Sequence, residues 1–345
     1  MTAVRSLPLL VLATLVAVGA VAAGLAPAAA GRAAPAPPVL HGLTAWTAVG
    51  DRIAFVARIG GRDGLWVERF GSNQPVRLAP AHCGPHEEQV DALAPGPSGS
   101  WACLERTVGN TEAYFSVDLV SRTGTVRHVA SAGGPISDGQ MTGDSIPFVF
   151  GDGSFLGFLH VAGSGTVTLM QIVPSGRARR VADLTGVSAP DAVATDSGHV
   201  VVRERGTVQV FTTAGAPVAS FAARAASVAV RRDRVVVRTT DRRLDSYTLA
   251  GRRVSSYPLA AASWTAGLAT YAGYAAYLGA NKAVHVVKLA TGRDRVVARA
   301  GAGWFFDGVS LQAAGAAAPL TTQRGGQFLV TFRFLPMASL LAAVG

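Results

Sequence analysis

The chain has 345 residues, of which 49% are hydrophobic and 15% are charged, with 40 glycines, 18 prolines and a formal net charge of +10. This composition is too apolar for an intrinsically disordered chain, and the even spread of glycine and proline indicates many turns between short strands. The positive charge favours anionic partners. All-β domains often reach this length, so the length does not require two domains.

The N-terminal region has the pattern of a secretory signal peptide, predicted over residues 1–30. Arg5 precedes an apolar run from Leu7 to Ala23, and the small residues from Pro27 to Ala30 suit signal-peptidase cleavage. We therefore predict export by the Sec route to a secreted or extracytoplasmic, cell-envelope location. The alternative is an uncleaved anchor, because the apolar run is close to the shortest length that spans a bilayer, and this segment is the one predicted contact with a membrane. Residues 31–38 are rich in alanine and proline and are predicted to form a linker.

A meander of three strands follows the linker. The segments Asp51–Arg58, Leu65–Phe70 and Pro75–Leu78 have strand composition and are separated by glycine-containing turns. Similar units recur along the rest of the chain, at Tyr114–Ala130, Thr166–Leu184, Val200–Phe221, Val235–Gly251, Tyr274–Gly292 and Gly308–Phe334. This periodicity predicts a repeat protein.

The spacing of the turn glycines in these units gives the length of the repeat. They are separated by 53, 52, 39, 36 and 41 residues and are Gly71, Gly124, Gly176, Gly215, Gly251 and Gly292. Blades of four short strands recur at about this interval in β-propellers. We therefore predict an all-β fold with a single β-propeller over residues 39–336, of seven blades with six as the alternative, and a C-terminal tail over 337–345. The strand Gln327–Phe334 is expected to close the ring against Val39–Trp46, which would remove the open edges.

The first two units resemble the TolB-type (WD-like) propeller repeat. Gly50–Val56, Gly64–Val67 and Pro75–Ala79 are similar to one full copy, and Pro97–Cys103 is similar to the turn and strand of a second. The resemblance implies a β-propeller of a kind that mostly binds proteins, with some related members acting as hydrolases or lactonases. Fold alone does not choose among these functions.

One polar loop offers ligands for a metal ion. Within ten residues the segment His82–Asp91 supplies imidazole, thiol and carboxylate groups, and the candidate ligands are His82, His86 and Glu87. The alternative is an exposed loop held by a disulfide between Cys83 and Cys103, which we favour because an even pair of cysteines in an exported chain is expected to be oxidised. Two buried thiols are the remaining possibility. No cofactor is therefore predicted, with calcium or zinc as the alternative.

The sequence favours a non-enzymatic protein over an enzyme. It contains no Gly-x-Ser-x-Gly elbow, no His-Glu-x-x-His, no phosphate loop and no Cys-x-x-Cys. The alternative function is a metal-dependent hydrolase or lactonase with its site in the central channel. Its candidate acids lie near strand starts and are Glu112, Asp138, Asp144, Asp191 and Asp307.

Arginine is concentrated between Arg224 and Arg253. Candidates for contact with an anionic surface are Arg231, Arg232, Arg242, Arg243, Arg252 and Arg253. We favour the other interpretation, in which these arginines alternate with Val235, Val237 and Leu244 on the solvent faces of outer strands. Few aromatic residues are interleaved with them, so nucleic acid is not an expected partner. We predict a monomeric exported binding scaffold that docks a protein or an anionic cell-envelope component.

Overall fold

The structure, a computed structural model, describes residues 37–80, 89–137, 140–260, 267–280 and 282–345. The chain divides into two compact units, Met1–Ala34 and Pro35–Gly345, and the described residues all belong to the second. The predicted signal peptide lies outside the described residues, so its cleavage stays a prediction.

The described residues of the second unit form antiparallel strands in six hydrogen-bonded sheets. The largest sheet joins the two ends of the unit through β1, and consists of β26 (Trp304–Phe306), β27 (Ser310–Gln312), β28 (Gly315–Arg324), β29 (Gln327–Pro336), β1 (Leu40–Val49), β2 (Arg52–Ile59), β3 (Arg62–Arg69) and β4 (Val76–Pro80). The next sheet consists of β5 (Gln89–Pro95), β6 (Trp101–Val108), β7 (Glu112–Val120), β8 (Val126–Ser137) and β9 (Gln140–Met141), with the short helix η1 (Pro97–Gly99) between its first two strands.

Four further sheets have four strands each. In chain order they are β10 (Ser145–Gly151), β11 (Leu156–Val161), β12 (Val167–Ile172) and β13 (Ala178–Asp183); β14 (Ala192–Asp196), β15 (His199–Glu204), β16 (Thr207–Thr212) and β17 (Pro217–Ala222); β18 (Ala225–Arg231), β19 (Arg234–Thr239), β20 (Arg243–Thr248) and β21 (Arg253–Pro258); and β22 (Leu268–Tyr271), β23 (Tyr274–Gly279), β24 (Ala283–Lys288) and β25 (Arg293–Arg299).

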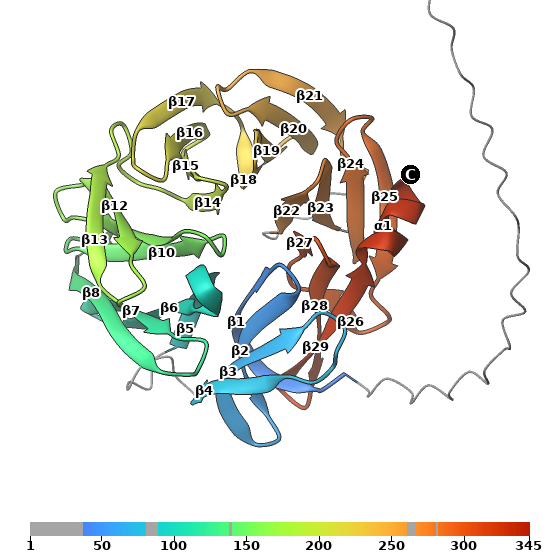
Figure 1. Cartoon of the computed structure of the whole chain (residues 1–345), viewed down its shortest axis with the longest axis horizontal. Coiled ribbons are helices and arrows are strands. Elements are labelled where there is room, and N and C mark those ends of the chain that lie inside the picture. The colour runs from blue at the N-terminus through green and yellow to red at the C-terminus, as the bar shows by residue number, and fades with distance from the viewer. Residues whose placement is uncertain (1–36, 81–88, 138–139, 261–266, 281) are drawn as a thin grey trace, which may run out of the picture. The chain divides into compact units, whose positions relative to one another are not determined.

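One strand of each blade lies innermost, and these inner strands contact one another in a closed ring, in the order β1, β5, β10, β14, β18, β22, β27 and back to β1 (Figure 1). The predicted ring of blades is therefore confirmed. Counting hydrogen-bonded sheets gives six, and counting inner strands gives seven, because the largest sheet contains two groups of strands.

The ends of the propeller meet where the sequence predicted. Leu40 of β1 pairs with Val330 of β29, and His41 pairs with Leu329. Around this seam Leu40, Phe55 and Phe332 belong to one buried apolar cluster. The closure is thus both a strand pairing and a packed interface, and it covers edges that would otherwise be open to aggregation.

The six repeat glycines occupy equivalent positions. Each lies in the turn between the third and fourth strands of its blade and has a positive φ, from 71° to 87°. Residues with a Cβ rarely adopt this conformation, which explains why glycine marks the repeat. At Gly251 a Cβ would also lie 2.8 Å from Cδ1 of Phe221 in the preceding blade, so this turn packs closely against its neighbour.

The core lies between the blades, and second strands are buried on both faces. Val235, Val236 and Val237 of β19 are each 0% exposed. Val235 and Val237 belong to an apolar cluster with the preceding blade, whereas Val236 packs with Tyr277 of the following blade. The predicted alternation of apolar and solvent-facing residues is therefore wrong for this strand, and Arg238 at its end is also buried at 2% exposure. A blade has neighbours on both sides, so both faces of its middle strands must be apolar.

The predicted C-terminal tail contains a helix, α1 (Met337–Val344), which begins directly after Pro336. Leu340 and Val344 are buried in the apolar cluster formed by β23, β24, β27 and β28. In the described part of the chain no helix has the length and apolar character needed to cross a membrane.

Candidate functional site at the mouth of the central channel

The inner strands surround a cavity of about 340 Å³ at one end of the channel. All seven inner strands contribute to its lining, through residues near their C-terminal ends. We call this end of the propeller the mouth face. It carries the turns between the first and second strands and between the third and fourth strands of each blade, and the opposite end is the far face.

Asp152 follows β10 and is held by four hydrogen bonds. Its Oδ1 accepts from the backbone N–H groups of Ser154 and Phe155, both at 2.8 Å, and from the Ser154 hydroxyl at 2.7 Å. Its Oδ2 accepts from the backbone N–H of Ser197, in the next blade, at 2.8 Å. Burial opposes ionisation, but these hydrogen bonds outweigh it and hold the pKa of Asp152 below its usual value.

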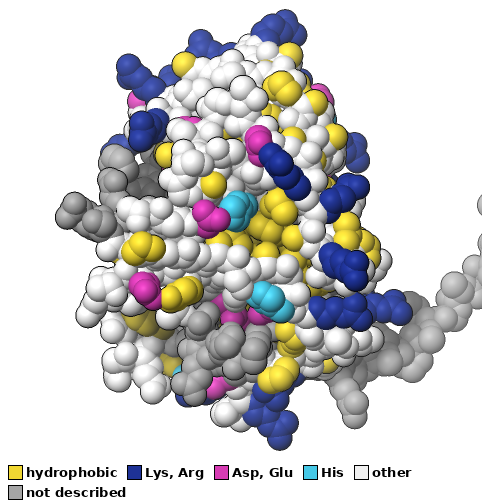
Figure 2. All heavy atoms as spheres, turned by 90° about the vertical axis from the view of Figure 1, so that its left-hand side faces the viewer, with side chains coloured by type: hydrophobic (Ala, Val, Ile, Leu, Met, Phe, Trp, Pro, Cys, Tyr) yellow, Lys and Arg dark blue, Asp and Glu magenta, His cyan; other side chains and the backbone are white. Residues whose placement is uncertain are grey.

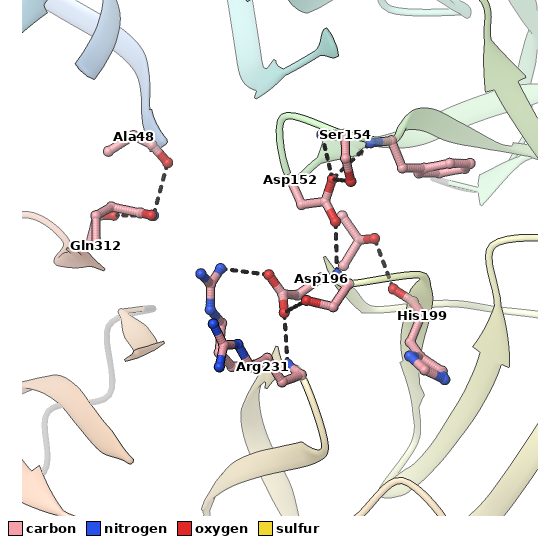
Figure 3. A network of polar contacts seen from close by, with 12 residues as sticks. Ala48, Asp152, Ser154, Asp196, His199, Arg231 and Gln312 are labelled. Carbon is pink, nitrogen blue, oxygen red and sulfur yellow. Dashed lines mark hydrogen bonds and ion pairs between the residues drawn. The ribbon is translucent and has the colours of Figure 1, made fainter. Parts of the chain in front are cut away.

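Asp196 repeats this arrangement one blade further on (Figure 3). Its side chain is 6% exposed, and its Oδ1 accepts from Nη1 of Arg231 at 2.6 Å. Its Oδ2 accepts from the backbone N–H of Arg232 at 2.7 Å and from the Ser197 hydroxyl at 2.5 Å. The Arg231 guanidinium also lies over the ring of Tyr271 in the following blade, 4.8 Å from its centroid. One carboxylate thus connects two turns, and Arg231 continues the connection to a third.

Two further contacts extend this series around the mouth. The backbone N–H of Gly153 donates to the carbonyl of Pro95 in the preceding blade at 3.3 Å. On the opposite side of the channel, Gln312 Nε2 donates to the carbonyl of Ala48 at 3.0 Å (Figure 3). This bond joins the last inner strand to the first. These bonds position the inner turns relative to one another.

The chemistry of this site is that of a structural ring. Both carboxylates already accept hydrogen bonds from protein donors, and a metal ion would have to displace those donors to bind. Within the described ranges no three His, Cys, Asp or Glu side chains gather at metal-binding distance. The geometry of Asp152 and Asp196 therefore gives no support to the channel-sited hydrolase alternative.

The acids proposed from the sequence for that alternative lie elsewhere. None of Glu112, Asp144, Asp191 and Asp307 lines the mouth cavity. Asp144 pairs with His160 Nε2 at 3.2 Å, and Asp191 pairs with Arg203 Nε at 2.5 Å. Asp138 lies outside the described residues. The acids that do line the mouth lie at the C-terminal ends of inner strands, Asp152 directly after β10 and Asp196 at the end of β14.

The candidate metal ligands His82, His86 and Glu87 lie outside the described residues, and so does Cys83. Cys103 lies on β6 and is 0% exposed, in an apolar cluster with Trp101. The disulfide and the metal site both stay predictions.

The six candidate arginines divide between the two faces of one blade. Arg231, Arg232, Arg252 and Arg253 lie in or beside turns of the mouth face, whereas Arg242 and Arg243 lie at the turn between β19 and β20 on the far face. Arg243 donates a hydrogen bond from Nε to the hydroxyl of Ser256 at 2.8 Å. The sequence cluster is therefore not one surface patch.

Charge is nevertheless unevenly distributed between the two faces. The basic residues of the mouth-face turns are Arg52, Arg69, Arg122, Arg177, Arg231, Arg232, Arg234, Arg252, Arg253, Lys288 and Arg293, and the acids of the same turns are Asp51, Asp152, Asp196 and Asp233. Two of these four acids, Asp152 and Asp196, are occupied in the ring of hydrogen bonds. On the far face, the described connections carry similar numbers of acids and bases. Figure 2 shows one side of the molecule, where a column of lysine or arginine side chains lies along the right-hand edge.

A groove of about 380 Å³ adjoins the mouth between the β18–β21 and β22–β25 blades. Arg231 and Thr270 line both the groove and the mouth cavity, so the two are continuous. Arg232 and Arg234 line its cationic part, together with Asp233, which pairs with Arg234 Nε at 3.3 Å and leaves Arg232 as the cation without a carboxylate partner among the described residues of this lining. Its apolar part includes Leu289 and Val254, which is 45% exposed.

Comparison with known proteins identifies the fold. No protein-family model matches the chain, and no curated protein matches its sequence. Among solved structures, the WD40 β-propeller domain of Doa1 matches with a TM-score of 0.53 and 11% identity, over 87% of this chain and 97% of that chain. PorZ, an essential bacterial surface component of the type-IX secretion system of Porphyromonas gingivalis, matches with a TM-score of 0.51 and 11% identity, over 87% of this chain and 39% of the PorZ chain.

The second unit is therefore an all-β propeller whose structural neighbours include a WD40 domain. At this level of identity the likeness establishes the fold and leaves function to be argued from the surface. The narrower TolB-type assignment stays a prediction.

Proposed function

We propose that this protein is a non-enzymatic docking scaffold, and that its mouth face binds an acidic segment of a partner protein. The observation that carries the proposal is the excess of basic side chains in the mouth-face turns, beside a groove that also offers exposed apolar surface. Long-range attraction from such a face concentrates an acidic partner and speeds its association.

The groove between the β18–β21 and β22–β25 blades supports a polypeptide partner over a uniform anionic polymer. Arg232 and Arg234 stand beside Val254, Tyr257 and Leu289 in one lining. An extended segment presents side chains alternately to opposite sides, so acidic and apolar residues in alternation match both parts of the groove. A teichoic acid or an anionic lipid headgroup would use the arginines and leave the apolar part without a partner.

We further propose that the protein acts outside the cytoplasmic membrane as a seven-bladed monomer of TolB type, with a disulfide between Cys83 and Cys103. The support for export is the signal-peptide pattern of residues 1–30, and the support for seven blades is the ring of inner strands. Intact mass of the protein from its own host tests signal-peptide cleavage and the disulfide. A chain beginning near Gly31 and about two daltons lighter than its reduced form is expected.

The docking proposal is tested by selecting peptides from a displayed random library on the full chain. Enriched peptides are expected to alternate Asp or Glu with apolar residues, and their binding should weaken as salt is raised. Arg232→Gln should weaken a selected peptide about threefold, in line with an exposed ion pair.

The matched control is Arg242→Gln, because Arg242 is also an exposed turn arginine with positive φ in the same blade, but on the far face. Neutral or basic enriched peptides would contradict the proposal, and so would equal losses from the two substitutions. Vesicles containing phosphatidylglycerol serve as the second probe. If they bind wild type and lose binding with Arg232→Gln while no peptide is enriched, the partner is a membrane surface instead.

A further inference from the structure

A second cavity, of about 350 Å³, lies between the first two blades and shares no lining residue with the channel mouth. Its walls come from β3, β4 and the turn between them on one side, and from the η1 turn and the turn after β7 on the other. The apolar lining residues are Val67, Val76, Leu78 and Trp101. Val76 is 68% exposed, so apolar surface is available at the opening.

Glu68 lines this cavity as a buried acid. Only 3% of the residue is exposed, although it is a carboxylate. The Ser72 hydroxyl and the backbone N–H groups of Asn73 and Gln74 donate to the carboxylate. Its Oε1 atom is nevertheless buried without a hydrogen-bond partner in the described structure. Burial raises the pKa of Glu68, outweighing these donors. A buried acceptor in this condition is costly unless a donor reaches it.

Three arginines surround the opening of the same cavity. Arg52, Arg69 and Arg122 all line it and are all exposed. Gly99 lies between two of them, because a Cβ at that position would be 3.5 Å from Nη1 of Arg52 and 3.7 Å from Cβ of Arg122. The ion pair of Arg69 with Asp51 is long, at 3.9 Å. The cavity therefore has a negative group at its wall, apolar surface beside it and positive groups at its rim.

From this arrangement we infer that the cavity binds a free amino acid with a large apolar side chain. The ammonium group of the ligand pairs with the Glu68 carboxylate in the cavity wall, its carboxylate faces the rim arginines, and its side chain packs on Val76 and Leu78. A volume of about 350 Å³ is at the small end of ligand pockets, which fits one amino acid better than a long peptide. Opposite charges on the ligand match opposite charges in the cavity, whereas a simple organic anion would leave Glu68 unpaired.

Isothermal titration calorimetry on the full chain tests this inference, with L-phenylalanine, L-leucine and L-tryptophan as probes. At least one is expected to bind. Its N-acetyl form lacks the cation and its amide form lacks the anion, and each is expected to bind about tenfold more weakly, the effect of losing one charged hydrogen bond. This comparison uses the wild-type protein and so does not depend on any variant folding.

Substitutions then assign the contacts. Glu68→Gln should weaken binding about tenfold, like loss of the ligand's cation, and Arg122→Ala should weaken binding about threefold to tenfold, while Arg177→Ala should leave binding unchanged. Arg177 is the matched control because it is exposed in the equivalent turn of the next blade but does not line the cavity. Equal binding of phenylalanine and N-acetylphenylalanine would overturn the inference, and so would absence of binding by all three amino acids at about 1 mM.

Discussion

Arg231 donates a hydrogen bond from Nη1 to Oδ1 of Asp196 at 2.6 Å, across the boundary between two neighbouring blades. The two residues are 35 positions apart in the chain. The separation is close to the repeat length, so the contact joins equivalent turns of successive blades. Asp152 makes the corresponding contact with Ser197, 45 residues further along. Such bonds hold neighbouring blades in fixed register at the channel mouth.

Replacing Asp196 should therefore destabilise the propeller. Asp196→Ala removes the acceptor of three hydrogen bonds and leaves the backbone N–H of Arg232 without its partner. The expected loss in free energy of unfolding is about 2 kcal/mol, measured by urea denaturation. Asp233→Ala is the control, because Asp233 is an exposed acid in the following turn and its ion pair with Arg234 is a surface pair. Equal stability of the two variants would show that the Asp196 network does not hold the blades together.

Asp152 should make the free energy of unfolding depend on pH. The pKa of Asp152 is lower in the folded state than in the unfolded state, where it is near 3.8. The ionised carboxylate therefore stabilises the fold at pH values above the unfolded-state pKa. That stabilisation is lost as the pH falls through the lower pKa of the folded state. Asp152→Asn removes this dependence. The variant should be less stable than wild type at pH 7, and the difference should shrink as the solution approaches pH 3 in urea titrations. Asp51→Asn, an exposed acid in the equivalent turn of the first blade, should behave as wild type at both pH values. A gap for Asp152→Asn that stays constant with pH would contradict this account.

Ring closure includes a short strand pairing at the seam, in which β1 pairs with β29 through Leu40 and His41. Leu40 is 0% exposed and pairs with Val330. Leu40→Ala should lower the free energy of unfolding by about 3 kcal/mol, the usual cost of a buried Leu→Ala change. Val39→Ala provides the control, since Val39 precedes the strand and is 52% exposed. Urea unfolding of both variants measures the difference, and a loss below about 1 kcal/mol for Leu40→Ala would mean that this seam is not packed as described.

The sequence predicted the repeat well because its signals are local. The sequence pattern predicted the turn glycines from Gly71 to Gly292, and it predicted the second and third strands of the blades. Both features depend on neighbouring residues, because apolar runs form strands and glycine adopts positive φ in turns. Inner strands such as β14 and β22 were not assigned. They are four or five residues long and rich in small residues, and they gain stability from the ring around them more than from their own sequence.

The channel mouth was harder to predict because its contacts join different blades. Nothing near Asp152 in the sequence indicates that its Oδ2 binds Ser197, and the candidate acids were chosen by strand position alone. Likewise Arg231 and Arg242 are close in sequence, yet strand β19 lies between them and runs from the mouth face to the far face. The missing information was which end of each strand faces the mouth, and that follows once the inner strand of each blade is known.

Two adjacent leucines of helix α1 differ in environment. Leu340 is 2% exposed and packs against the last two blades, whereas Leu341 is 40% exposed. A helix at the edge of a repeat fold can detach without global unfolding, so its stability is read best by local hydrogen exchange. Leu340→Ala should weaken docking of α1 by about 2 kcal/mol, which corresponds to roughly 30-fold faster amide exchange over residues 337–344. Leu341→Ala should change this exchange little. If both substitutions accelerate exchange equally, α1 is held by its own helical hydrogen bonds, and Leu340 does not anchor it to the propeller.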